Sequence, residues 1–231
     1  MLVNKAAAQH LAMAAPEIHF ERAPWRLSGQ VIGVALNDPA ALAALGGAVH
    51  APPYKAPPQA PVLYIKPRNT LAGIGARVVL PADVAEFELG ATLGLVIGRT
   101  ACAVPAAQAL AHVAGCTLVL DLSVPHDSFY RPSVRFKARD GSCLIGPLMA
   151  AVDPDTTTLL LSVDGEPAQA VAAGRMLRSA ARLIADVSEF MTLRPGDLLL
   201  LGLPASAPRV HAGQRFALTA AGLGTLEGCV A

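Results

Sequence analysis

The chain has 231 residues, a net charge of +1 and only 15% charged residues. This length suits one domain, or one domain with a short arm, and the charge balance is unlike the basic face of a nucleic-acid-binding protein. The longest dense apolar run, Leu198 to Leu203, is far below the roughly 20 residues that cross a bilayer. We therefore expect neither nucleic acid nor a membrane as a partner.

Residues 1–29 are expected to form a loose amphipathic arm, and residues 30–231 the domain proper. Gln9 and His10 interrupt the start of the chain before an apolar region long enough for a secretory signal develops. The four cysteines include no C-x-x-C pair and no histidine at zinc-finger spacing, so neither structural zinc nor a redox motif is indicated. Reduced thiols and a cytoplasmic location are the expectation.

Short apolar runs predict a chain with many strands. Gln30 to Leu36 is the first, and a helix is expected over Ala40 to Val49. The stretch Ala51 to Pro61 holds five prolines, which prevent a helix and central strand pairing, so it is expected to be a loop or a polyproline II segment. Later runs, which alternate with Gly, Pro and Asp, predict strands at Val62–Ile65, Arg77–Leu80, Leu93–Ile97, Leu118–Leu122, Leu159–Val163, Asp197–Leu201 and Arg215–Leu218.

Two helices are expected among the later strands, Pro105 to Ala114 and Arg175 to Phe190, the second with apolar residues at helical spacing. Asp164-Gly165 favours a tight hairpin turn, because both residues tolerate positive φ. The regular strand–helix alternation of a doubly wound sheet is missing. The expected fold class is therefore α+β and β-rich, with mixed sheets.

The segment Arg131 to Asp140 (RPSVRFKARD) is the most informative for chemistry, since every cation in it has an odd number. On a strand these cations would share one face: Arg131, Arg135, Lys137 and Arg139. Such a face suits a substrate with several carboxylates. The alternative is a solvated face neutralised by nearby acids such as Asp127 or Asp140, and the spacing alone favours this alternative.

Other candidate residues give weaker signals. Asp121 ends an apolar run, where it could ligate a cation, orient a base or simply cap a turn. Glu86 and Glu88 form an E-x-E pair whose carboxylates would point to one face. The histidines are scattered, and each is expected to be a surface or helix residue: His10, His19, His50, His112, His126 and His211. The chain has no nucleophile elbow and no dinucleotide fingerprint, so nucleotide cofactors are not supported.

A series of short motifs becomes specific in combination. Its members are Tyr64–Thr70 (YIKPRNT), Leu93–Gly98 (LGLVIG), Ala114-Gly115 followed by Asp121, Lys137–Asp140 (KARD), Ser188–Asp197 (SEFMTLRPGD) and Gly222–Leu226 (GLGTL). In order and spacing, over about Gln30 to the C-terminus, the series resembles the fumarylacetoacetate hydrolase family. The resemblance implies a mixed β-sandwich roll of the type found in the C-terminal domain of that family.

Tyr54–Pro58 and Ser128–Pro132 most resemble the family's isomerase/decarboxylases of 4-hydroxyphenylacetate (homoprotocatechuate) degradation, in their first half or subunit. The resemblance implies decarboxylation of 5-oxopent-3-ene-1,2,5-tricarboxylate and isomerisation of 2-hydroxyhepta-2,4-diene-1,7-dioate. In that family an Mg²⁺ or Mn²⁺ ion stabilises the enolate that forms, while cations hold the remote carboxylates. A small polycarboxylate is therefore the expected substrate.

The resemblance also implies roles for residues of this chain. Lys137 falls where the family has a substrate-contacting lysine, and Asp121 matches a metal ligand, so these two are the expected catalytic residues. The expected substrate-binding residues are Arg131, Arg139, Asp140, Lys66 and Tyr130. Packing remains the alternative role for Lys66.

The chain departs from the family pattern at the metal centre. Gly90 and Thr92 occupy the positions of the family's E-x-E ligands, Ala41 falls near its acid/base histidine, and Leu203 replaces a threonine in a Gly-Thr-Pro loop. Glu86 and Glu88 lie four residues upstream, about 13 Å along an extended strand, too far to replace ligands that bind at about 2.1 Å. We therefore expect no metal bound by this chain.

These losses suggest a subunit that works beside a homologous metal-bearing second subunit, or a homodimer. A non-catalytic structural or regulatory subunit is the alternative function. A metal-dependent acylpyruvate hydrolase ranks last, because it needs both a water-activating base and an intact ion site.

Overall fold

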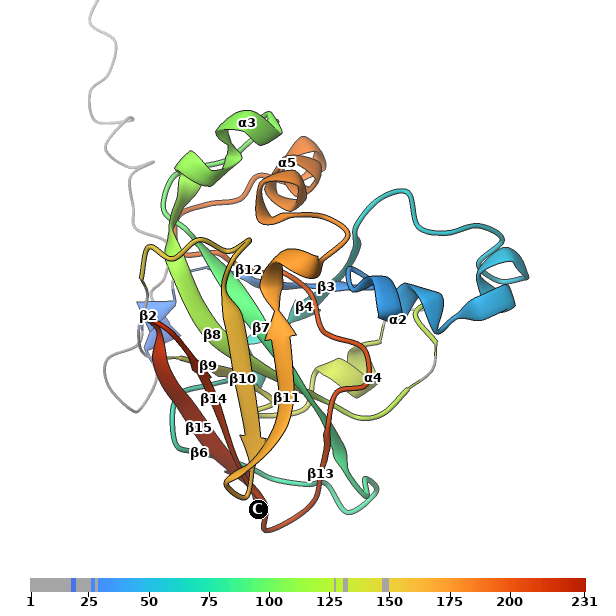
Figure 1. Ribbon diagram of the computed structural model, residues 1–231, viewed down its shortest axis with the longest axis vertical. Coiled ribbons are helices and arrows are strands. Elements are labelled where there is room, and N and C mark those ends of the chain that lie inside the picture. Colours follow the sequence, from blue (N-terminus) through green and yellow to red (C-terminus); the bar gives the residue numbers. More distant parts are fainter. Residues whose placement is uncertain (1–17, 20–25, 28, 127, 131–132, 147–149) are drawn as a thin grey trace, which may run out of the picture.

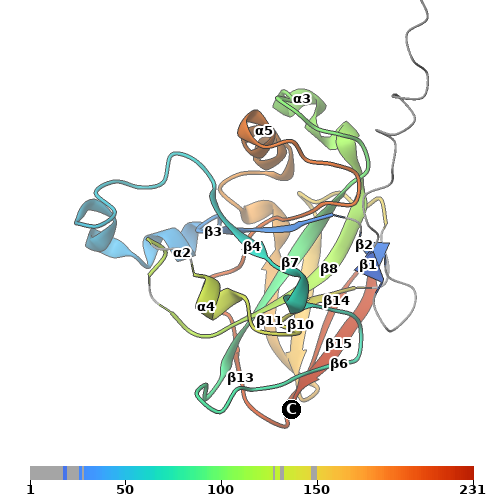
Figure 2. The same ribbon diagram turned by 180° about the vertical axis from the view of Figure 1, so that it is seen from behind.

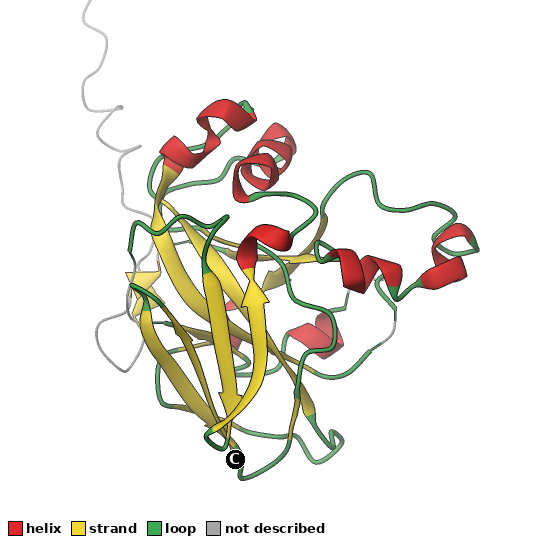
Figure 3. Cartoon of the chain, in the orientation of Figure 1, coloured by secondary structure: helices red, strands yellow, loops and turns green. Residues whose placement is uncertain are grey.

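The computed structural model describes residues 18–19, 26–27, 29–126, 128–130, 133–146 and 150–231. In this part of the chain two curled β-sheets pack together, with short helices around the larger one (Figures 1 and 3). β1 (Ile18–His19) and β2 (Arg26–Leu27) pair with each other as a separate small sheet, and most of the expected arm over residues 1–29 lies outside the described residues. Among the described residues, no helix is long and apolar enough to span a bilayer.

The larger sheet has eight strands and carries the candidate site. Its two longest strands, β7 (Phe87–Ile97) and β8 (Val113–Ser123), run antiparallel next to each other. The strand order is β4-β3-β12-β7-β8-β9-β5, and β13 pairs with β7 off this path. The other strands of this sheet are β3 (Val31–Ala35), β4 (Val62–Lys66), β5 (Leu71–Ala72), β9 (Cys143–Ile145), β12 (Leu198–Leu200) and β13 (Arg209–Val210).

The smaller sheet has five strands in the order β11-β10-β14-β15-β6. They are β6 (Ala76–Val78), β10 (Thr158–Val163), β11 (Glu166–Ala172), β14 (Arg215–Ala220) and β15 (Gly224–Val230). β10 and β11 are joined at Asp164 and Gly165, whose φ angles are 52° and 87°. The predicted hairpin turn is therefore confirmed.

Side-chain alternation along β7 and β8 gives the larger sheet two different faces. Leu93 of β7 and Leu120 of β8 belong to the same buried cluster as Leu161 and Leu218 of the smaller sheet, so this face forms the main core between the sheets. Successive side chains on a strand point to opposite faces. Asp121, the neighbour of Leu120, therefore points to the face turned away from the smaller sheet.

The longest helix, α5 (Ala180–Phe190), packs beside α3 (Ala106–Ala109) (Figure 1). The Ser179 hydroxyl accepts a hydrogen bond from the Arg182 amide (3.3 Å) and so caps the first turn of α5. The other helical segments are α2 (Pro39–Ala43), α4 (Val134–Lys137), η1 (Gly46–His50), η2 (Arg68–Thr70), η3 (Leu110–His112) and η4 (Ala173–Arg175).

The expected α+β, β-rich class, a mixed β-sandwich roll, is confirmed, but the predicted helices are shorter in the structure. The helix expected over Ala40–Val49 divides into α2 and η1, because Gly46 adopts a positive φ of 50°. The helix expected over Pro105–Ala114 gives way to β8 at Val113. The helix expected over Arg175–Phe190 begins only at Ala180, the first residue of α5.

The prediction of a strand over Arg131–Asp140 is wrong. Its middle forms the helical turn α4, in which the Lys137 amide donates to the Ser133 carbonyl at 2.9 Å. Residues two positions apart on such a turn are about 200° apart around the axis. Lys137 is consequently buried, whereas the Arg135 side chain is 78% exposed. Arg131 lies outside the described residues.

Asn37 joins three segments of the chain just after β3. Its Nδ2 donates to the carbonyls of Leu201 (2.6 Å) and Arg178 (3.1 Å), and its Oδ1 accepts from the Arg178 amide (2.9 Å). The residue is fully buried, so water cannot replace these bonds. This amide holds the end of β3 against the segments that precede α5 and follow β12.

Replacement of Asn37 by alanine is expected to lower the free energy of unfolding by about 2–4 kcal/mol, because three buried hydrogen bonds are lost at about 1 kcal/mol or more each. Asn69→Ala is the matched control, since Asn69 also donates to a carbonyl (Ala138, 3.1 Å) but at an exposed position. Urea denaturation of both variants measures the difference. Equal losses would contradict the role of Asn37.

Candidate functional site

The candidate site is centred on Asp121, on the face of the larger sheet turned away from the smaller one. Asp121 lies opposite Gly90 of β7 and Cys143 of β9, and it is fully buried. α4 lies against both β4 and β8 at this point (Figure 2). Segments far apart in the sequence thus converge on one carboxylate.

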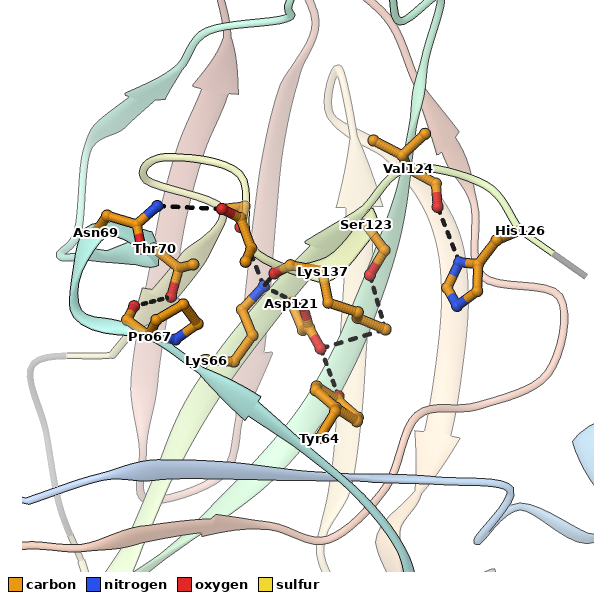
Figure 4. A network of polar contacts seen from close by, with 12 residues as sticks. Tyr64, Lys66, Pro67, Asn69, Thr70, Asp121, Ser123, Val124, His126 and Lys137 are labelled. Atoms are coloured by element: carbon orange, nitrogen blue, oxygen red, sulfur yellow. Dashed lines mark hydrogen bonds and ion pairs between the residues drawn. The ribbon is translucent and has the colours of Figure 1, made fainter. Parts of the chain in front are cut away.

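Three side chains contact the Asp121 carboxylate (Figure 4). Lys66 Nζ, from the end of β4, lies 2.8 Å from Oδ1. Tyr64 Oη, two residues earlier on the same strand face, donates to Oδ2 at 2.5 Å. Lys137 Nζ, from α4, lies 3.5 Å from the same Oδ2. Both carboxylate oxygens therefore already accept from this chain's own donors.

The two ammonium groups differ in how many of their protons are used. An ammonium group has three N–H donors. Lys66 Nζ uses all three, on Asp121, on the Lys137 carbonyl (2.5 Å) and on Ser142 Oγ (3.0 Å). Lys137 Nζ donates to Ser123 Oγ at 2.7 Å and more weakly to Asp121. Hydrogen bonds thus account for all three N–H groups of Lys66 but for only two of Lys137, whose Nζ also lies 4.7 Å from the centroid of the Tyr64 ring.

The charges in the cluster do not cancel. Burial alone would raise the pKa of Asp121, but the ammonium groups of Lys137 and Lys66 and the bonds from Lys66 and Tyr64 outweigh it, and the pKa is lowered. Burial lowers the pKa of Lys137, with Asp121 opposing that shift. Burial and the neighbouring carboxylate raise the pKa of Tyr64 well above its ordinary value. With two ammonium groups and one carboxylate, the cluster carries a net positive charge when all three are ionised.

A cavity of about 300 Å³ opens beside this cluster. Its polar lining comes from Glu88, Asp121, Ser123, His126 and Lys137. The rest of the wall is mainly apolar and is formed by Ala35, Leu36, Ala41, Ala44, Leu45, Gly90, Phe129, Leu203, Pro204, Ala205, Ser206 and Ala207. The arrangement offers an anion a buried ammonium donor and a hydroxyl, surrounded by hydrocarbon.

Two glycines shape this region because their missing side chains make room for others. A Cβ at Gly33 of β3 would lie 2.0 Å from the Tyr64 ring, so only glycine at this position allows the ring to reach Asp121. A Cβ at Gly90 would lie 2.8 Å from Leu203 Cδ2 and 3.0 Å from the Asp121 carbonyl oxygen. Leu203 therefore covers the space where a longer side chain at Gly90 would begin.

Carboxylates are few around Asp121. Across the described ranges, no group of three or more His, Cys, Asp or Glu side chains could together hold a metal ion. Glu88 lies on the same strand face as Gly90 and reaches the cavity wall, but Arg209 lies 3.1 Å from its carboxylate and 3.3 Å from that of Glu86. The E-x-E pair, at the start of β7, is thus engaged by an arginine of β13.

The structure brings together some of the residues singled out from the sequence and separates others. Lys66, Asp121 and Lys137 form one cluster. Arg139, 3.4 Å from Asp83, and Asp140 line a different surface hollow. The expected substrate-binding roles of Arg139, Asp140 and Lys66 remain predictions, and so do the catalytic roles of Lys137 and Asp121. The same holds for the substrate-binding roles of Tyr130, which is 57% exposed and packs edge-on against Tyr54, and of Arg131, which lies outside the described residues.

Sequence reasoning missed two members of the site. His126 was expected at the surface or on a helix, but it is half-buried in the loop after β8 and lines the cavity. Tyr64 was visible only as the start of a motif, although it is bonded directly to Asp121. His126 follows Asp121 by five residues, but this spacing alone does not place its ring in a cavity.

Replacement of Asp121 by asparagine is expected to destabilise the fold by about 3–5 kcal/mol, because two buried ammonium groups lose their counter-charge. Asp83→Asn is the matched control: Asp83 also pairs with arginines but is exposed, and no measurable change is expected there. Thermal and urea denaturation compare the two variants. A small effect at Asp121 would mean that the cluster is not held by its charge.

The pH dependence of stability offers a separate test of the same carboxylate. The pKa of Asp121 is lower in the folded state than its unfolded value of about 3.9. The ionised carboxylate therefore contributes fully to the free energy of unfolding above about pH 4, and this contribution is lost as the pH falls through the folded pKa. Between pH 5 and 2, the free energy of unfolding, measured by urea denaturation at each pH, is expected to fall more steeply for the wild type than for Asp121→Asn.

Comparison with known proteins places this geometry in context. The model of the fumarylacetoacetate (FAA) hydrolase C-terminal family matches residues 30–231. A bifunctional isomerase/decarboxylase of 4-hydroxyphenylacetate degradation from Escherichia coli is 39% identical over 201 residues, which cover 87% of this chain and 47% of that protein. An oxaloacetate tautomerase from E. coli K12 is 30% identical over 70% of this chain and 78% of its own length. The chain spans about half the length of the bifunctional relatives it matches.

Solved structures agree with the sequence comparison. A fumarylpyruvate hydrolase from Pseudomonas aeruginosa, in complex with Mn²⁺ and pyruvate, superposes with a TM-score of 0.78 at 26% identity, covering 94% of this chain and 96% of that one. A 2-hydroxyhepta-2,4-diene-1,7-dioate isomerase from Mycobacterium marinum superposes with a TM-score of 0.75 at 29% identity, covering 88% of this chain and 75% of that one. The fold and the motif series thus lead to one conclusion: this chain belongs to the fumarylacetoacetate hydrolase family.

Proposed function

We propose that this chain is a polycarboxylate-binding subunit of an isomerase/decarboxylase of the fumarylacetoacetate hydrolase family. The observation that carries the proposal is the buried cluster of Lys66, Lys137 and Asp121, which has more positive than negative charge and borders a cavity at Lys137. The names of relatives at 38–39% identity support the reaction class. In this proposal the substrate is a 2-oxo or 2-hydroxy dienoic acid with two or three carboxylates.

The cluster suits the shared chemical demand of decarboxylation and isomerisation. When carbon dioxide or a proton leaves a carbon next to a carbonyl group, negative charge develops on the carbonyl oxygen. Lys137 Nζ and Ser123 Oγ, 2.7 Å apart, could both lie beside that oxygen. Asp121 holds Lys137 in place, and the apolar wall strengthens the interaction by excluding water.

The donor set around Asp121 does not fit a divalent ion, and we propose that this chain binds none of its own. Both Asp121 oxygens accept from Tyr64, Lys66 or Lys137, so a cation would approach two ammonium groups. Gly90 and Thr92 supply no carboxylate, and Mg²⁺ prefers several oxygen ligands near 2.1 Å. In this proposal a homologous second subunit supplies the metal-bearing site, consistent with bifunctional relatives of about twice this length.

Metal binding tests that part of the proposal. Isothermal titration of the purified chain with Mg²⁺ or Mn²⁺ is expected to show no binding at submillimolar concentration. The comparison is a triple variant in which Gly90→Glu and Thr92→Glu supply carboxylates and Leu203→Thr removes the side chain that covers Gly90. This variant is expected to gain measurable affinity. Tight binding of Mn²⁺ by the unmodified chain would overturn the proposal, whatever the variant does.

Substrate binding tests the role of Lys137. Lys137→Met is expected to weaken binding of 2-oxoglutarate, a stable 2-oxo dicarboxylate, by about 10- to 100-fold, because a hydrogen bond to a charged group contributes about 1.5–3 kcal/mol. Lys55→Met, which removes an exposed lysine, is the matched control and should leave the affinity unchanged. A loss of binding without loss of turnover in the complex with a metal-bearing homologue would favour a structural or regulatory subunit.

A further inference from the structure

His126 is the one imidazole among the described residues that line the cavity. It follows β8 in a short loop, and its ring lies on the side of the polar network that holds Ser123 and Lys137 (Figure 4). The chain therefore lines one cavity with both Lys137 and a group that can accept and give up a proton.

The hydrogen bonding of the ring fixes its tautomer. His126 Nδ1 lies 3.0 Å from the carbonyl oxygen of Val124. A carbonyl oxygen only accepts, so Nδ1 carries the proton and, in the neutral ring, Nε2 has a free lone pair. Nε2 is buried and has no hydrogen-bond partner. A buried polar atom without a partner is costly in a structural role, which suggests that it meets a ligand.

Aromatic neighbours hold the ring in one orientation. The His126 ring stacks on Phe136, with planes 3° apart and centroids 5.0 Å apart, and Phe129 packs against it at 5.5 Å. Phe136 belongs to α4, the same turn that carries Lys137. The turn that carries the ammonium group therefore also supports the imidazole ring.

The other charged groups of the cavity are committed elsewhere. Glu88 is 3.1 Å from Arg209. Asp121 accepts from three donors, and Lys137 donates to Ser123 and Asp121. Ala41, also in the wall, has no group that moves a proton. Among the described lining residues this leaves Nε2 of His126, which is buried and has no partner, as the base that is not already engaged.

We infer that His126 is a catalytic residue of this chain that transfers a proton to and from the carbon next to the carbonyl of a bound 2-oxo acid, without a metal ion. The inference rests on the proposed function and adds to it the group that moves the proton. It also assigns the tautomerisation half of the chemistry to this chain's own cavity.

The step balances without a co-reactant. The C3–H bond breaks and its proton goes to Nε2, while the electron pair forms the C2–C3 double bond. The carbonyl π pair moves onto oxygen, which accepts the hydrogen bond from Lys137 Nζ. Return of a proton from Nε2 to C3 reverses the step. In D₂O the proton on Nε2 exchanges with solvent, so the reverse step places deuterium on C3 of the substrate.

The test is deuterium exchange at C3 of 2-oxoglutarate, followed by proton NMR with the full chain in metal-free D₂O. The test variant is His126→Asn, whose amide can still donate to Val124 but has no counterpart of Nε2. His112→Asn is the matched control, because His112 Nδ1 bonds a carbonyl in the same way (Thr100, 2.9 Å) at an exposed site. Titration calorimetry measures the affinity of each protein for 2-oxoglutarate.

The expected result is at least about 100-fold slower exchange for His126→Asn, with its affinity within about threefold of the wild type and His112→Asn unchanged. Binding by the wild type without exchange, or exchange that survives His126→Asn, would overturn this inference and leave the proposed function standing. If the wild type does not bind 2-oxoglutarate, the proposed function fails and this inference with it.

A measurement on the wild type covers the case in which the variant does not fold. Nitrogen-15 NMR of labelled histidines distinguishes a protonated Nδ1 from a protonated Nε2. The neutral His126 ring is expected to carry its proton on Nδ1, and the Nε2 signal is expected to shift when 2-oxoglutarate binds. A proton found on Nε2 of the free neutral ring would overturn the inference.

Discussion

The contact between the buried Asp121 carboxylate and the ammonium groups of Lys66 and Lys137 is the constraint on which the rest of the site depends. Charges are tolerated away from water only where partners surround them. Here the partners come from β4, β8 and α4, so the same bonds that satisfy the carboxylate hold three segments together. The positive charge left over makes an anion a stabilising ligand, which links binding to folding.

The register of the larger sheet determines which groups reach this carboxylate. Glu88 is opposite Ser123 and Gly90 is opposite Asp121, so these residues share one face. A shift of one residue would turn all of them into the main core. Gly33 adds a second requirement, because only a residue without a side chain leaves room for the ring that bonds to Asp121.

The sequence predicted the fold class, most of the strands and the lysines near Asp121, because strands have a short local period and the family motifs occur in a fixed order. It failed over Arg131–Asp140, since alternate cations are equally compatible with a helical turn when one of them is drawn into a buried cluster. His126 was missed for a related reason. Its environment depends on Phe136 and the Val124 carbonyl, and no spacing rule connects these groups to a cavity.

The leucine that covers Gly90 limits what a substitution at this position can do. A carboxylate introduced at Gly90 alone would press against Leu203 and the Asp121 backbone, and Thr92 would supply no second carboxylate. A single substitution at Gly90 therefore disturbs packing without completing a set of ligands. A cation site at this place would need the removal of Leu203 and the addition of carboxylates together, whereas the bonds between the lysines and Asp121 need neither change.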